Sequence, residues 1–142
     1  NTVVGQIRNP ETFVTFAGIR FDATNVAELA LAGHLPILHV RGATGTIEPI
    51  DNVHPPLGVV ESQRHASRRV PFEPGDLFVL LTDGLTEVNN SRHEEFGSAR
   101  VEGVILRHLQ RPLAELYAEI LKATHAHGSQ TDDQTLLLVR TR

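Results

Sequence analysis

The sequence contains no cysteine, and this absence removes several kinds of chemistry at once. Disulfides, thiol nucleophiles and thiolate zinc sites are excluded, and the absence is compatible with a reducing compartment. There is also no apolar run that approaches the length of a membrane span, and no signal peptide opens the chain. We therefore expect a cytoplasmic protein that does not bind a membrane.

Positive charge is scarce as well. The formal net charge is −4 and the isoelectric point is near 6.0, which leaves no basic field to attract nucleic acid. Arg64, Arg68 and Arg69 are too few to change this. They could hold a phosphate through paired guanidinium contacts, although such arginines more often form the solvated face of a strand. Nucleic acid is not an expected partner.

The length of 142 residues and the hydrophobic content of 40% suit one globular core. We expect a single domain over residues 1–142. Residues 1–9 carry apolar side chains at helical spacing and stop before Pro10, so they are expected to be the remnant of a helix. The chain starts at Asn1 without a methionine, which suggests a fragment of a longer protein.

Hydrophobic periodicity predicts an antiparallel meander followed by helices. Ser98 is a candidate N-cap for the first long helix, and Pro112 suits the start of the second. The short polar connection at residues 23–25 predicts a hairpin. Strands are expected at residues 13–22, 26–32, 37–41 and 46–50, and amphipathic helices around residues 101–109 and 113–121.

The stretch at residues 75–87 combines a buried strand with an acidic turn. Residues 77–81 are all apolar, which is typical of a strand that is buried on both faces. Asp83 follows at the end of this strand, and Gly84 allows the backbone to turn sharply or to approach a ligand closely. Taken alone, Asp83 could simply cap the next segment.

A second acidic turn precedes the last apolar strand, at residues 130–140. Asp132 and Asp133 are adjacent, so in an extended chain they point to opposite sides and at most one of them readily joins Asp83. Carboxylates gathered without cysteine or a histidine chelate favour Mg²⁺ or Mn²⁺. A solvated acidic turn that binds nothing is the alternative interpretation.

Three histidines invite a ligand role but are better explained by local structure. His34 lies in a Gly-His-x-Pro break, where a ring nitrogen commonly bonds the nearby backbone. His125 and His127 are expected at a helix end that breaks at Gly128, with their rings in solvent.

Six short motifs occur in an order that resembles the metal-dependent PPM-type (2C-type) serine/threonine phosphatases, and within them the bacterial stage II sporulation protein E branch. The resemblance implies an α+β fold, an antiparallel β-sandwich flanked by helices in αββα layers. Domains of this family begin with an Asp-x-x-Gly-[His/Lys]-Gly stretch whose aspartate bridges two metals. This sequence lacks that stretch, so we expect the C-terminal part of such a domain, incomplete at its N-terminus. The motifs are Phe13-Val14-Thr15, residues 32–36, Pro56-Leu57-Gly58-Val59, residues 75–87, Glu95-Phe96-Gly97 and residues 132–135.

The resemblance also implies a reaction. Two Mn²⁺ or Mg²⁺ ions would activate a water molecule that hydrolyses phosphoserine or phosphothreonine, so no side chain acts as nucleophile. Asp83 and Asp132 would hold one metal, with Asp133 supporting them. The substrate would be a phosphorylated protein, an anti-sigma-factor antagonist in a bacterial signalling pathway, and the polar loop at residues 87–97 would lie beside the site.

Two further expectations follow from the missing first motif. The fragment alone should be almost inactive, and its open sheet should favour a homodimer or an exchange of elements between copies. The alternative function is a catalytically inactive, phosphatase-like module that binds a partner protein. A structural fragment whose acidic turns bind nothing remains a third interpretation.

Overall fold

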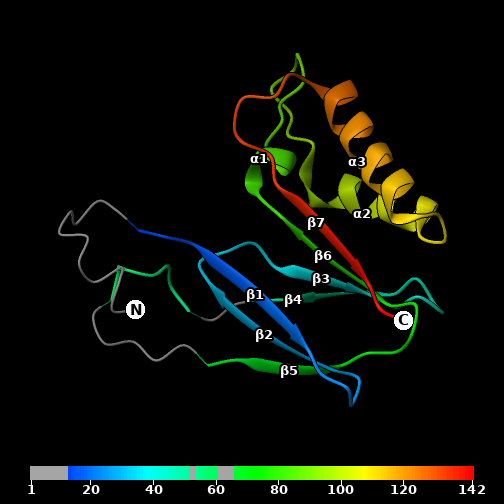
Figure 1. The fold of residues 1–142 in the computed structure, drawn as a ribbon. Coiled ribbons are helices and arrows are strands. Elements are labelled where there is room, and N and C mark those ends of the chain that lie inside the picture. The colour runs from blue at the N-terminus through cyan, green and yellow to red at the C-terminus, as the bar shows by residue number, and fades with distance from the viewer. Residues whose placement is uncertain (1–12, 52–53, 61–65) are drawn as a thin grey trace. The chain divides into compact units, whose positions relative to one another are not determined.

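The computed structural model describes residues 13–51, 54–60 and 66–142 (Figure 1). The helix remnant predicted at residues 1–9 and the side chain of Arg64 lie outside these residues. The chain divides into two compact units, which are described separately below. The first unit comprises Asn1–Pro36 and Ile50–Phe72, and the second comprises Ile37–Pro49 and Glu73–Arg142.

The first unit contains a three-stranded antiparallel sheet in the order β1-β2-β5. The carboxylate of Asp22 accepts hydrogen bonds from the backbone N–H groups of Thr24, at 2.8 Å, and Val26, at 3.1 Å. These bonds close the predicted hairpin, and Asn25 takes the positive φ of 57° that the turn requires. The strands are β1 (Phe16–Phe21), β2 (Val26–Ala32) and β5 (Arg68–Pro71).

The two arginines of β5 are solvated, as the sequence favours, although as neighbours in a strand they point to opposite faces. Both are exposed. Arg69 pairs with Asp22 across 3.3 Å, which is a surface contact of the kind that contributes little to stability.

The meander predicted from the sequence changes sheets after β2. The chain breaks at Gly33, whose φ is +63° and whose N–H donates to His54 O at 3.0 Å. A Cβ on Gly33 would stand 2.3 Å from Pro56, so only glycine fits this break. The next two strands belong to a different sheet from β1 and β2.

The second unit is built on a four-stranded sheet in the order β4-β3-β6-β7. All five residues of β6 are buried, as the apolar run predicts. β6 lies between β3 and β7 and pairs antiparallel with both, from Leu77↔Arg140 to Leu81↔Leu136 along β7. The strands are β3 (Ile37–Val40), β4 (Ile47–Ile50), β6 (Leu77–Leu81) and β7 (Leu136–Arg140).

Helices α1 (Asp83–Thr86), α2 (Gly97–His108) and α3 (Leu113–His127) complete this unit. The long helices α2 and α3 pack against each other, and α3 packs against β7 (Figure 1). The α+β class with antiparallel sheets and helices is therefore confirmed. None of the helices in the described parts of the chain is both long enough and apolar enough to cross a membrane.

The prediction of Ser98 as an N-cap is wrong, because α2 begins at Gly97 and its N-cap is Phe96, two residues before Ser98. Phe96 is buried, and its N–H donates to Val88 O at 2.8 Å. The guanidinium of Arg100 donates to the carbonyls of Glu95 and Phe96, both at 2.8 Å. The chain is thus anchored at Phe96, and the helix starts immediately after it.

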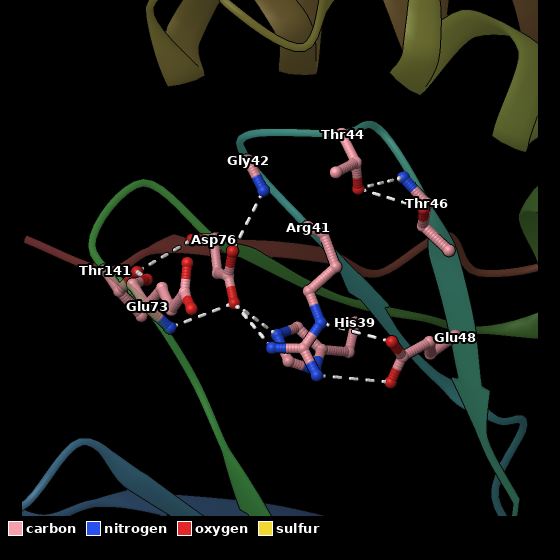
Figure 2. A network of polar contacts seen from close by, with 9 residues as sticks. All are labelled: His39, Arg41, Gly42, Thr44, Thr46, Glu48, Glu73, Asp76 and Thr141. Atoms are coloured by element: carbon pink, nitrogen blue, oxygen red, sulfur yellow. Dashed lines mark hydrogen bonds and ion pairs between the residues drawn. The ribbon is translucent and has the colours of Figure 1, made fainter.

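A buried carboxylate organises the end of the sheet at which β6 begins (Figure 2). Asp76 Oδ1 accepts from Gly42 N at 2.9 Å, and Oδ2 accepts from Glu73 N at 3.1 Å. Oδ2 also contacts His39 Nε2 at 2.8 Å and accepts from Arg41 Nη1 at 3.2 Å. His39 is fully buried and stacks on the ring of Phe78, with centroids 4.3 Å apart. One carboxylate therefore joins the loop after β3 to the turn before β6.

The C-terminal residues are tied to the same turn. The hydroxyl of Thr141 donates to Glu73 O at 2.6 Å, and its N–H donates to Asp76 O at 2.9 Å. A Cβ on Gly42 would stand 2.3 Å from Gly75 O, so the two loops are in backbone contact. This network was not predicted from the sequence.

The charge state of Asp76 should matter for stability. Burial raises the pKa of this carboxyl, but the N–H groups of Gly42 and Glu73 and the ring of His39 outweigh burial, so the pKa lies below its usual 3.8. A group whose pKa is lowered by folding stabilises the fold above its unfolded pKa. That contribution is lost as the pH falls through the folded pKa.

We predict that Asp76→Asn lowers the free energy of unfolding at pH 7 by about 1–3 kcal/mol, because an amide presents donors to other donors. The variant should also lose part of the decline in stability that the parent shows below about pH 4. Urea titrations at several pH values measure both effects, and Asp51→Asn, at an exposed position, is the control. Equal stability of the two variants would contradict the prediction.

Candidate metal centre

The first acidic turn lies at the other end of β6. Thr82 is the N-cap of α1, without a capping bond from its side chain, and Asp83 is the first residue of this helix. Asp83 is therefore not the cap that the alternative interpretation assigned to it. Its Oδ1 accepts the N–H of Gly84 at 3.0 Å, and its side chain is exposed.

The second acidic turn leads into β7. Asp132 Oδ1 accepts the N–H of Asp133 at 2.7 Å, and Asp132 O accepts from Gln130 Nε2 at 2.9 Å. Asp132 and Asp133 are both exposed.

The backbones of the two turns are in direct contact. A Cβ on Gly84 would stand 2.3 Å from Asp133 O and 3.4 Å from Asp132 C. The regular β6–β7 ladder ends at Leu81↔Leu136, and a single further backbone bond follows it, from the N–H of Thr82 to Thr135 O at 3.1 Å. This packing places the backbone of the second acidic turn against Gly84, the residue after Asp83.

The hydroxyl of Thr82 takes part in the same contact. It accepts the N–H of Thr135 at 2.9 Å and donates to Asp133 O at 3.3 Å. The N–H of Thr135 therefore bonds the side chain of Thr82, and not a backbone carbonyl, at the point where the ladder ends.

The three carboxylates carry unbalanced negative charge. Within the described residues, no arginine, lysine or histidine forms an ion pair with Asp83, Asp132 or Asp133. A cation near these carboxylates would offset part of this charge.

The donor set suits a hard cation that keeps part of its water shell. In the part of the chain that the structure describes, no group of three or more His, Cys, Asp or Glu side chains could hold a metal on its own. Mg²⁺ is commonly bound through one or two carboxylates and several waters, and such a set of oxygens also suits Mn²⁺. Asp83 and Asp132 are carboxylates of the kind that such a site uses, and Asp133 follows Asp132 in the chain.

The three candidate histidines lie outside this group. His34 Nδ1 contacts Leu35 O at 2.8 Å, which is the local backbone bond expected for it. α3 ends at His127, with Gly128 as its C-cap. The prediction that both rings at this helix end are in solvent holds for His125 but is wrong for His127. His127 is half-buried, contacts Glu94 O at 2.8 Å and packs on the ring of Phe96 in a T-shaped arrangement.

The polar loop after α1 is an ordered hairpin. Asn89 and Glu95 form an antiparallel bridge, and Asn90 Oδ1 accepts the N–H groups of Arg92 at 2.8 Å and Glu94 at 3.1 Å. Gly128 packs on this hairpin, since a Cβ there would stand 2.0 Å from Asn89 O. The Asn-Asn-Ser run in the sequence is a turn signal, but the support from α3 could not be predicted from it.

We predict that Gly84→Ala destabilises the fold by about 1–3 kcal/mol, because the new methyl group would overlap a backbone carbonyl of the second acidic turn. Gly103→Ala is the matched control. Its Cβ would meet only the end of the Arg107 side chain, at 3.5 Å, within α2. That substitution should be neutral or stabilise the fold by up to about 1 kcal/mol. Urea denaturation of both variants tests the contact, and similar effects would argue against it.

Comparison with known proteins gives a consistent result. The family model described as stage II sporulation protein E (SpoIIE) matches residues 1–142. The SiaA-PP2C domain of Pseudomonas aeruginosa has a TM-score of 0.72 and 23% identity, over 84% of this chain and 48% of that one. The structure with the PP2C phosphatase domain and a regulatory fragment of SpoIIE from Bacillus subtilis has a TM-score of 0.74 and 18% identity, over 98% and 41%.

The catalytic domain of the serine/threonine protein phosphatase PstP, solved with two manganese ions, has a TM-score of 0.63 and 16% identity, over 87% of this chain and 56% of that one. The chain thus spans between 41% and 56% of the length of these three structures. A search of curated proteins found no match. The structural matches establish the PP2C fold, and the family model covers every residue. The chain belongs to the SpoIIE family of PPM-type (PP2C-type) phosphatase domains.

Proposed function

We propose that this chain supplies metal ligands to a phosphatase that hydrolyses phosphoserine or phosphothreonine on a protein. The observation that carries the proposal is the packing of the two acidic turns at the ends of β6 and β7, with Gly84 against the backbone of Asp132 and Asp133. These turns match the family motifs that contain metal-binding aspartates. The PstP structure, which shares the fold, was solved with two manganese ions.

In this proposal Asp83 and Asp132 bind one Mn²⁺ or Mg²⁺, and Asp133 supports them. The metal, when bound, acidifies water and stabilises charge on the phosphoryl group. The chain itself provides the geometry, because both ligands stand at the ends of paired strands. No side chain is required as a nucleophile.

The proposed substrate is a phosphorylated protein, an anti-sigma-factor antagonist in a bacterial, cytoplasmic signalling pathway. The hairpin closed by the Asn89–Glu95 bridge would contact it, since this hairpin begins only a few residues after Asp83 and is held rigid by Asn90. A rigid loop beside a site can select a protein surface without a large ordering cost.

A catalytically inactive module that binds a partner protein is the second candidate. One observation favours it: the described residues supply no group of three or more metal-binding side chains. A binuclear site would need at least one more carboxylate, because two divalent cations a few ångströms apart repel each other strongly.

We predict that Asp83→Asn lowers the affinity for Mn²⁺ more than Asp133→Asn does, since loss of a direct ligand charge outweighs loss of a supporting one. The electron paramagnetic resonance signal of free Mn²⁺, titrated against protein, gives both affinities. Equal losses would contradict the assigned roles, and the absence of any loss would place the metal elsewhere.

We predict that the 142-residue chain hydrolyses a phosphoserine protein or an aryl phosphate very slowly. A longer polypeptide that carries these residues within a domain of the matched length should be faster by orders of magnitude, because the effects of a second metal are each worth several kcal/mol. Initial rates with added Mn²⁺ measure the difference. Equal rates would show that these residues suffice, and no activity in either would support the binding module.

A further inference from the structure

We propose that Gln134 is a positioning residue for the metal centre. Its side-chain amide fixes the separation of the two acidic turns. The inference rests on the proposed function, because it assigns a role to a residue that binds no metal itself. Gln134 Nε2 donates to Gly84 O at 2.8 Å, so the residue after Asp133 is bonded to the residue after Asp83.

The amide is held from both sides. Its Oε1 lies 3.4 Å from Nε2 of His125, near the end of α3, while its NH₂ group faces the carbonyl of Gly84. Gln134 is half-buried, which restricts its rotamers more than those of the exposed residues around it. It therefore connects α3, the second acidic turn and α1.

The position of this bond explains why it should affect the carboxylates. Beyond Leu81↔Leu136 the strands no longer exchange regular ladder bonds. The bonds to Thr82 hold the nearer side of the turns. Gly84 must remain without a side chain, because a Cβ would overlap Asp133 O. On this far side of the contact, Gln134 of the second turn bonds the carbonyl of Gly84 in the first.

Loss of this link should loosen the turns without unfolding the core. A ligand pair that is held at a fixed separation binds a cation more tightly than one that must be ordered on binding. Groups that orient metal ligands typically change affinity by about tenfold or more when they are removed. Gln134→Met is the suitable variant, since it keeps the length and bulk of the side chain and removes the donor.

The chain offers a closely matched control. Gln110 Nε2 also donates to a glycine carbonyl, that of Gly42, at 3.0 Å. Gly42 lies beside Asp76, at the start of β6, whereas the acidic turns follow its end. Gln110→Met therefore removes the same kind of bond far from the proposed ligands.

The test is a titration of Mn²⁺ by electron paramagnetic resonance with the parent chain, Gln134→Met, Gln110→Met and Asp83→Asn, together with the thermal midpoint of each metal-free protein. We expect Gln134→Met to weaken Mn²⁺ binding by about tenfold. Gln110→Met should leave binding unchanged, and the two glutamine variants should have similar metal-free midpoints. A purely structural role would lower the midpoint of Gln134→Met and leave its affinity for Mn²⁺ as in the parent.

Three other results would overturn the inference. If Asp83→Asn weakens binding and Gln134→Met does not, Gln134 has no positioning role and the proposed function stands. If both glutamine variants weaken binding equally, the effect is not specific to the turns. If the parent binds no Mn²⁺, or Asp83→Asn binds as the parent does, the metal centre itself is wrong and the inference falls with it.

Discussion

The complete burial of β6 is the constraint on which the second unit depends. Five consecutive residues, Leu77–Leu81, are removed from water, so this strand can carry charge only at its ends. Asp76 stands immediately before it and Asp83 shortly after it. The two ends therefore face the same physical problem, a carboxylate next to an apolar core.

The fold resolves this problem differently at each end. Asp76 is buried, and donors from Gly42, Glu73, His39 and Arg41 surround it. Its charge is neutralised within the protein, so it stabilises the junction of two loops and has no capacity left for a ligand. Asp83 is exposed and accepts one backbone N–H, and the exposed Asp132 and Asp133 lie in the turn whose backbone packs against Gly84. This contrast separates a structural carboxylate from carboxylates that remain available to a cation.

The sequence predicts the parts of the structure that depend on local pattern. The apolar run of β6, the hairpin before Val26 and the spacing of apolar residues in α2 and α3 all identify their elements. The start of α2 is not determined by local sequence alone, because the N–H of Phe96 bonds Val88 O across a hairpin. The change of sheet after β2 depends on contacts of Gly33 with residues near position 56. The hydrophobic periodicity of the sequence cannot predict a contact of this kind. The pairing of Asp83 with Asp132 is predicted from the resemblance to a family, not from the hydrophobic pattern of the sequence.

The network at Asp76 shows what single-residue reasoning leaves out. His39 looks isolated in the sequence, yet a histidine within an otherwise apolar strand must find a partner when the strand is buried. That argument gives a signal for a buried acid somewhere in the chain, without saying which one. The same logic applies in reverse at the acidic turns, where three carboxylates find no cationic side chain in the described residues. A cation bound from solvent would supply the counter-charge that the described residues lack, and the contacts of Gly84, Thr82 and Gln134 hold the two turns against each other, as the proposed metal centre requires.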